Sequence, residues 1–139
     1  MKRFVVDCSV VMAWCFEDEA DKYADSVLDL LADAEAIVPS IWSLEVANVL
    51  LVGERRKRLT EADSLRFVNL LRALPITIDQ ETGNRAWSET LSVGRENGLS
   101  SYDAAYLELA MREGVALATR DDRLKEAAGK CGVTLVVRK

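Results

Sequence analysis

Short apolar runs alternate along this chain with longer stretches in which apolar residues recur every three or four positions. The short runs are rich in residues that favour β-strands, and they cover residues 4–6, 36–38, 75–78, 115–119 and 133–137. The longer stretches are typical of helices, and they cover residues 10–16, 23–31, 41–56, 61–74, 82–96, 99–110 and 121–129. Strands that alternate with helices indicate an α/β protein. We predict a single domain over residues 1–139, with a five-stranded parallel sheet flanked by helices.

The stretch 99–110, Leu-Ser-Ser-Tyr-Asp-Ala-Ala-Tyr-Leu-Glu-Leu-Ala, carries the central acid of the predicted site. Ser100 or Ser101 can cap this helix, and Ser100 with Asp103 has the spacing of a capping box. Asp103 would then lie at the positive end of the helix dipole, and the apolar residues after it predict that the helix is buried. The alternative is that Asp103 only takes part in the cap.

Three more acids are placed so that they could join Asp103. Asp7 follows the first strand and Asp121 follows the fourth, and in parallel sheets ligands bind at the carboxyl ends of the strands. Glu45 lies on an unusually apolar helix, where a charge is costly unless something compensates it. Each has an alternative: Asp7 can cap the next helix, Glu45 could pair with a Lys or Arg, and Asp122 could share the role of Asp121.

Several carboxylates near one point cannot all stay ionised without a cation. The sequence contains no histidine, which removes the usual general base and most zinc sites. Oxygen ligands suit Mg²⁺ or Mn²⁺, which activate water and bridge phosphate oxygens in phosphoryl chemistry. The side chains expected to hold the carboxylates or a water in place are Ser9, Asn48, Ser101 and Thr119.

Composition narrows the classes of partner. The formal net charge of -5 argues against passive, charge-driven binding to nucleic acid or to membranes. The one dense basic run, residues 54–58, is typical of cations near a helix C-terminus, with an RNA backbone contact as the alternative. Three cysteines without a Cys-x-x-Cys pair predict reduced thiols. The sequence shows neither a transmembrane run nor a signal-peptide pattern, so we expect a cytoplasmic protein without a membrane partner.

The order and spacing of these residues resemble those of the PIN-domain ribonucleases, and among them the VapC-type toxins of bacterial and archaeal toxin–antitoxin pairs. The motifs that carry the resemblance are Asp7-Cys8-Ser9, Glu45 with Asn48, Ser101-Tyr102-Asp103-Ala104 and Thr119-Arg120-Asp121, so that it covers essentially the whole chain. It implies a five-stranded parallel sheet and endonucleolytic cleavage of RNA at a Mg²⁺ or Mn²⁺ site. It also implies a homodimer and an inhibitory antitoxin. The site residues that it implies are Asp7, Glu45, Asp103 and Asp121.

The residues that two other classes of phosphate-handling protein require are missing from this chain. A phosphatase of the haloacid dehalogenase type would need Asp-x-Asp where this chain has Asp7-Cys8-Ser9, and the acids and lysine of a phosphoacceptor receiver domain are not found. The alternative from another class is a noncatalytic metal-binding or protein-interaction module. The rings of Trp14, Phe16 and Trp42 either belong to the core or form an antitoxin groove or dimer surface.

Overall fold

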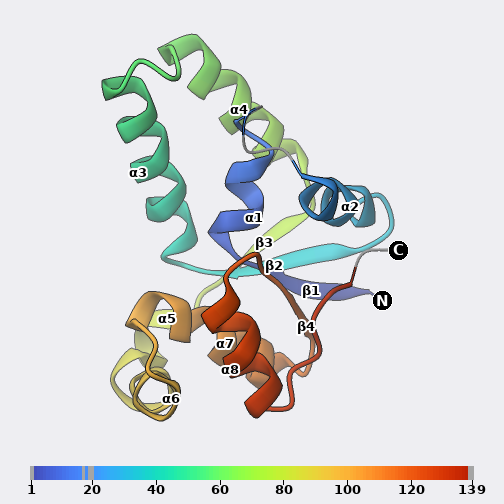
Figure 1. The fold of residues 1–139 in the computed structure, drawn as a ribbon, viewed down its shortest axis with the longest axis vertical. Helices are drawn as coiled ribbons and strands as arrows, with labels where there is room; N and C mark the ends of the chain where they lie inside the picture. Colours follow the sequence, from blue (N-terminus) through green and yellow to red (C-terminus); the bar gives the residue numbers. More distant parts are fainter. Residues whose placement is uncertain (1, 17, 19–20, 138–139) are drawn as a thin grey trace.

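A four-stranded parallel sheet forms the centre of the molecule, with strand order β3-β2-β1-β4. The computed structural model describes residues 2–16, 18 and 21–137. In Figure 1 the sheet lies between α1 to α4 above it and α5 to α8 below it. The strands are β1 (Arg3–Val6), β2 (Glu35–Pro39), β3 (Ile76–Asp79) and β4 (Ala116–Ala118). The parallel arrangement places the carboxyl ends of all four strands at one edge.

The helices follow the amphipathic stretches closely. The stretch 82–96 forms α5, a π-helical turn over Ala86–Thr90, and α6 in succession. Helix α4 is capped at its N-terminus, because Thr60 and Asp63 form a complete capping box. The helix bounds are α1 (Cys8–Ala13), α2 (Lys22–Leu30), α3 (Trp42–Arg55), α4 (Glu61–Ala73), α5 (Thr82–Arg85), α6 (Leu91–Asn97), α7 (Ser101–Glu113) and α8 (Asp122–Lys130).

The core lies on both sides of the central strand β1. Phe4, Val5 and Val6 are completely buried, as expected of a parallel strand whose two faces are both covered by helices. Helix α7 contacts β1, β2 and β4, and every residue from 104 to 110 is buried. The sequence prediction that this helix is largely buried is therefore confirmed, while Ser101 and Tyr102 at its beginning are exposed.

The prediction of a fifth strand over residues 133–137 is wrong. In the described part of the chain this segment forms only one isolated bridge, between Leu135 and Leu117. The amide of Leu117 donates to the carbonyl of Thr134, and the amide of Val136 donates to the carbonyl of Leu117, both at 2.9 Å. The carbonyl of Val136, which would continue this ladder, instead accepts a hydrogen bond from the hydroxyl of Tyr23 at 2.8 Å. The β-favouring residues pack beside β4 without becoming a strand.

A buried ionic network ties α7 to β3 and α5. Glu108 is 4% exposed and accepts from Arg85 at 2.8 Å and from Arg112 at 3.1 Å. Arg112 also donates to both carboxylate oxygens of Asp79 at 3.1 and 2.9 Å. These hydrogen bonds lower the pKa of Asp79 and raise that of Arg112. The network compensates a carboxylate that would be costly to bury alone.

The aromatic rings considered for a partner surface belong mainly to the core. Phe16 and Trp42 are buried, and the indole of partly buried Trp14 donates to the carbonyl of Ala24 at 2.8 Å. These rings therefore belong mainly to the core, although Phe16 and Trp42 each line a pocket at its edge. Large apolar side chains are exposed elsewhere on the hairpin of α3 and α4, namely Leu44, Leu51, Leu65 and Leu70.

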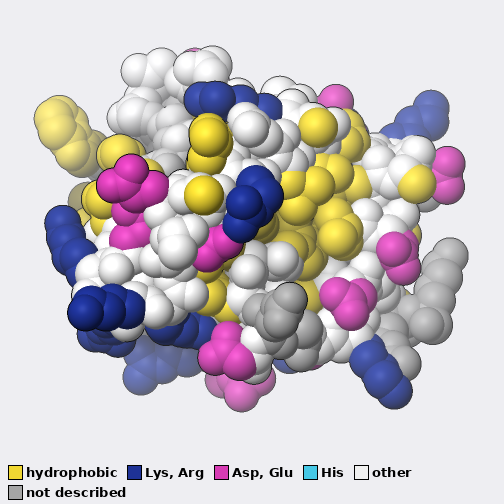
Figure 2. All heavy atoms as spheres, turned by 90° about the horizontal axis from the view of Figure 1, so that it is seen from above, with side chains coloured by type: hydrophobic (Ala, Val, Ile, Leu, Met, Phe, Trp, Pro, Cys, Tyr) yellow, Lys and Arg dark blue, Asp and Glu magenta, His cyan; other side chains and the backbone are white. Residues whose placement is uncertain are grey.

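The basic run lies where α3 ends, as its sequence pattern indicates. Arg55 is in the last turn of α3, Lys57 has a positive φ of 59° in the turn that follows, and Arg58 forms an ion pair with Asp18. Figure 2 shows cationic and anionic side chains interspersed over the face seen from above, with apolar side chains near its middle. That face therefore carries no large field of one sign.

Two further observations concern sequence expectations about cysteines and membranes. Cys8, Cys15 and Cys131 all lie in the described part of the chain and form no disulfide, as their spacing predicts. Among the described residues, no helix is both long and apolar enough to cross a membrane.

Candidate metal centre

Asp7 is the most deeply buried acid of the candidate site. It follows β1 and caps α1, accepting from the amide of Val10 at 3.2 Å, so its capping role is confirmed. Its carboxylate also accepts hydrogen bonds from the hydroxyls of Ser9, at 2.6 Å, and Thr119. Burial raises the pKa of Asp7, although these hydrogen bonds oppose the shift, and the charge of Asp103 raises it further. These hydrogen bonds therefore orient the Asp7 carboxylate, but they do not fully compensate its negative charge.

Asp121 approaches the same edge from the end of β4. It caps α8 by accepting from the amide of Leu124 at 3.0 Å, and its own amide donates to the hydroxyl of Thr119 at 3.0 Å. Thr119 therefore connects the two strand ends, since the same hydroxyl donates to Asp7. By contrast, the side chain of Asp122 is 99% exposed and lies 3.8 Å from Lys125. The structure gives Asp122 no share in the site.

Asp103 lies in the first turn of α7. Ser100, rather than Ser101, is the cap, and its hydroxyl accepts from the amide of Asp103 at 3.2 Å. Partial burial raises the pKa of the Asp103 carboxyl, and the charge of Asp121 raises it further. Ser100, and not Asp103, therefore caps α7. The charge of Asp103 raises the pKa of Asp7 and of Glu45.

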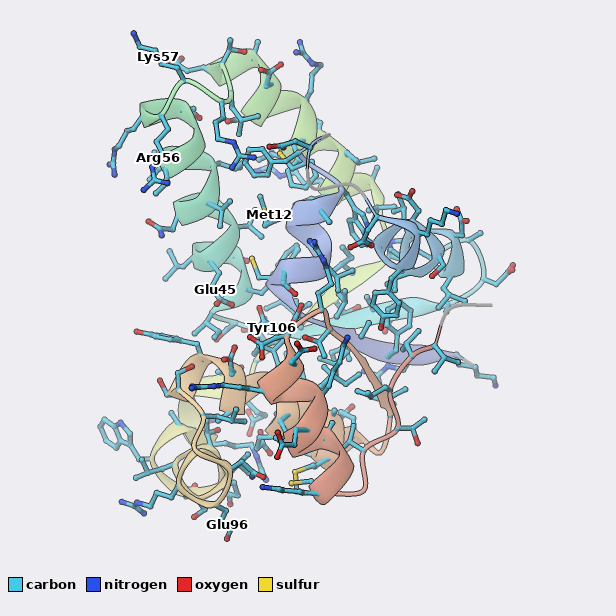
Figure 3. The ribbon with its side chains drawn as sticks, viewed as in Figure 1. Met12, Glu45, Arg56, Lys57, Glu96 and Tyr106 are labelled. Carbon is cyan, nitrogen blue, oxygen red and sulfur yellow. The ribbon has the colours of Figure 1, made fainter. Side chains whose placement is uncertain are left out.

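Glu45 reaches this region from the first turn of α3. Its Oε1 accepts a hydrogen bond of 2.6 Å from the hydroxyl of Tyr106, which is 1% exposed (Figure 3). Burial raises the pKa of Glu45, and the charges of Asp103 and Asp7 raise it further. Within the residues that the structure describes, no Lys or Arg forms an ion pair with Glu45. The alternative of a salt-bridged Glu45 is wrong for this part of the chain.

Of the four polar side chains expected to support the acids, two form hydrogen bonds to an acid and two do not. Ser9 and Thr119 contact Asp7 as described, whereas Ser101 and Asn48 are exposed and make no hydrogen bond to the four acids in the described part of the chain. Sequence reasoning missed Tyr106. Its signal was present, because it follows Asp103 by one helical turn and so shares its face of α7.

A cysteine nucleophile does not fit this site. Burial and the nearby charges of Glu45 and Asp7 raise the pKa of the Cys8 thiol to about 12. A thiol needs a depressed pKa to act as a thiolate at neutral pH. The chemistry available at this edge therefore rests on carboxylate oxygens.

The donor set fits a hard divalent cation. No three of the described Asp, Glu, Cys or His side chains lie close enough to hold an ion together as they stand. Mg²⁺ in phosphoryl-transfer sites is commonly bound by only one or two carboxylates, with water and substrate phosphate completing its shell. Burial raises the pKa of Asp7, Glu45 and Asp103, and repulsion among the acids raises it further; a bound cation would offset both effects.

Comparison with known proteins identifies the family. The family model of the PIN domain matches residues 4–130. The chain belongs to the PIN domain family. Ribonuclease VapC9 of Mycobacterium tuberculosis is 33% identical to this PIN domain over 137 residues, which are 96% of this chain and 98% of that relative.

Two solved structures share the fold of this PIN domain. PAE2754 from Pyrobaculum aerophilum gives a TM-score of 0.66 at 24% identity, covering 91% of this chain and 79% of that one. VapBC2 from Rickettsia felis, bound to a DNA fragment from its promoter, gives a TM-score of 0.67 at 12% identity, with 96% and 97% covered. At these identities the likeness concerns the fold alone, and it supports the α/β architecture with a parallel sheet.

The stability of the metal-free PIN domain should reveal the repulsion among its acids. We expect Asp103→Asn to melt at or above the temperature of the wild type in EDTA, because Ser100 still caps α7 and one repelling charge is gone. The raised folded pKa of Asp103 means that the folded state binds a proton more readily than the unfolded state. The destabilisation is therefore present at neutral pH and is lost as the pH falls through the folded pKa. Thermal melts in EDTA should show the advantage of Asp103→Asn shrinking as the pH is lowered towards 4.

If Asp103 had only a structural role, the order of the melting temperatures would be reversed. The variant would then be less stable than the wild type in EDTA at neutral pH, and added Mg²⁺ or Mn²⁺ would stabilise both proteins equally. A ligand role predicts a larger metal-induced rise in melting temperature for the wild type, because binding to the folded state alone stabilises it by mass action.

Proposed function

We propose that this PIN domain is a metal-dependent endoribonuclease and the toxin of a type II toxin–antitoxin pair. The observation that carries the proposal is the approach of Asp7, Glu45, Asp103 and Asp121 from four different elements, where burial and the charges of neighbouring acids raise the pKa of the first three. The 33% identical relative, Ribonuclease VapC9, supports the same activity. Hydrolysis of RNA phosphodiester bonds is the reaction class.

The four carboxylates would hold Mg²⁺ or Mn²⁺, by one or two of them directly and by the others through water. Such an ion supplies charge to phosphate oxygens and lowers the pKa of water. The chain's own contribution is orientation. Ser9 and Thr119 fix the two oxygens of Asp7, and Tyr106 fixes Oε1 of Glu45. Thr119 and Tyr106 belong to other elements than the acids they contact, so the packing of the fold preorganises Asp7 and Glu45.

The proposed partners are RNA, a cognate antitoxin protein and a second copy of the chain. A toxin–antitoxin complex from Klebsiella pneumoniae shares this fold, with a TM-score of 0.64 at 18% identity, and supports an antitoxin partner. The exposed leucines of α3 and α4 offer apolar surface of the kind that protein partners cover. The homodimer and the cytoplasmic location stay predictions.

The proposal is tested by the metal dependence of cleavage. Purified protein, freed of antitoxin, should cut single-stranded RNA in Mg²⁺ or Mn²⁺, lose this activity in EDTA and regain it when the metal is restored. Gel analysis of a mixed-sequence RNA labelled at its 5′ end measures this directly.

Undiminished cleavage in EDTA would overturn the metal mechanism. A protein that binds Mn²⁺ in a calorimetric titration but cuts none of the RNAs supplied would favour the noncatalytic metal-binding module. A protein that neither binds metal nor cuts RNA would leave protein interaction as the function of the fold.

A further inference from the structure

A groove runs along α1 and α3 and leads away from the acids. It has a volume of about 370 Å³. Its apolar floor includes Met12 and Phe16 on one side and Val49 and Val52 on the other. Figure 3 shows Met12 on α1 beside α3, with Glu45 at the beginning of α3 and Arg56 just past its end. Helices α1 and α3 are in contact, so the groove lies along their junction.

One end of the groove adjoins the candidate metal centre. Cys8 and Ser9 line it, and Ser9 donates to Asp7 at 2.6 Å. On α3, Asn48 and Val52 follow Glu45 at helical spacing, and both line the groove. Arg56 comes 11 positions after Glu45, which corresponds to about 16 Å along a helix axis. The groove therefore extends from the acids over a distance that a few nucleotides would cover.

The charges in this groove are all positive. Three arginines line it, and none of its described lining residues is acidic, although the whole chain has a formal net charge of -5. Arg120 lies near the acid end, where it pairs with Asp21 at 2.8 Å and donates to the carbonyl of Ser9 at 3.4 Å. Arg58 packs over the ring of Phe16 at 4.1 Å from its centroid. Arg56 is exposed beyond the last turn of α3.

A strip of cations that leads away from a cluster of acids suits a chain of phosphates with one bond placed at the acids. The acids repel phosphate unless a metal ion is present, whereas the arginines attract it; Arg58 and Arg120 are each paired with an aspartate, and Arg56 forms no ion pair with a described residue. Apolar side chains between them offer surfaces for bases and riboses, as in other sites that bind single strands without reading sequence. A duplex keeps its bases stacked inside, so they would not reach this apolar floor.

We propose that this groove is the path of single-stranded RNA on one side of the scissile bond, with Arg56 and Arg120 as the phosphate contacts. The inference rests on the ribonuclease function proposed above. It assigns Arg56, in the middle of the basic run, to substrate binding at a distance from the chemistry.

The test compares Arg56→Gln with Arg95→Gln. Both remove one exposed arginine and change the net charge equally, but Arg95 lies on α6, outside the groove. Binding of a fluorescein-labelled 12-nucleotide single-stranded RNA is followed by anisotropy in EDTA, where no metal-dependent cleavage takes place, at several salt concentrations. We expect Arg56→Gln to bind about three- to tenfold more weakly, with a log–log salt dependence shallower by about 0.7, and Arg95→Gln to match the wild type.

Cleavage kinetics in Mg²⁺ give a second readout. Because Arg56 is remote from the acids, Arg56→Gln should raise KM and leave kcat unchanged. Equal RNA affinity and salt dependence for both variants would overturn the proposal. Weaker binding of a co-expressed antitoxin to Arg56→Gln, with RNA affinity intact, would assign the groove to a peptide and overturn it too. The binding arm does not need catalysis, so a wild type that binds RNA in the groove but never cuts it would refute the ribonuclease function alone.

Discussion

Asp121→Asn is expected to lower the rate of metal-dependent RNA cleavage by about 100-fold or more, whereas Asp122→Asn leaves it within about twofold of the wild type. The two residues are neighbours in sequence, and the substitution is chemically the same. Asp121 faces Asp103 closely enough to raise its pKa, while the side chain of Asp122 is 99% exposed. Initial rates on a labelled RNA, at saturating Mg²⁺ and Mn²⁺, measure the difference.

The fold should survive both substitutions. Asn is as good a helix cap as Asp, so the bond from the amide of Leu124 to residue 121 is retained. Circular dichroism and melting temperature check this for each variant. Equal activity of Asp121→Asn and Asp122→Asn would show that Asp121 is only the cap of α8. The same loss is expected for Asp7→Asn, Glu45→Gln and Asp103→Asn, since each removes a charge that would hold the ion.

Glu108→Gln is expected to destabilise the protein by about 3 kcal/mol. Glu108 is 4% exposed and receives hydrogen bonds from Arg85 and Arg112, so its neutralisation leaves two partly buried guanidinium groups short of countercharge. Arg112 keeps its two bonds to Asp79, which limits the loss. The free energy of unfolding from urea titration, with protein and metal concentrations fixed, gives the value.

Glu126→Gln is the matched control for this measurement. Glu126 is also on a helix and lies 3.8 Å from Lys130, but its side chain is 73% exposed. Exposed pairs of this kind contribute about 0 to 1 kcal/mol, so the control should be close to wild type. If both variants lost the same small amount, the network around Glu108 would be no more than a surface ion pair.

The fold was largely predictable because local patterns of apolar and polar residues specify its strands and helices. The buried runs of β1 and β2 and the amphipathic period of α2 and α4 agree with the environment in which each element lies. The C-terminal segment 133–137 has the same local pattern as a strand but forms only one bridge. The pattern does not show that the carbonyl of Val136, which would extend the pairing with β4, accepts a hydrogen bond from Tyr23 instead.

The candidate acids were predictable from where they stand relative to strand ends, but their environment was not. Glu45 was expected to need a partner, and the sequence did not reveal that this partner is the hydroxyl of Tyr106, 61 positions away. Ser101 and Asn48 were expected to support the acids, and both are exposed without a hydrogen bond to them in the described part of the chain. Motif spacing locates a residue on an element, whereas the rotation of that element decides what its side chain meets.

The sequence by itself determined the α/β class of the fold, because that class follows from residue type and local period. It also predicted Asp7, Glu45, Asp103 and Asp121 as the acids of an oxygen-ligand site. Only the tertiary structure decided which polar groups are adjacent across the chain. It placed Thr119 between Asp7 and Asp121, buried Glu108 among its arginines, and lined a single groove with Arg56 and Arg120. These contacts depend on how helices pack on the sheet, and that packing is set by many side chains at once, so no short motif records it.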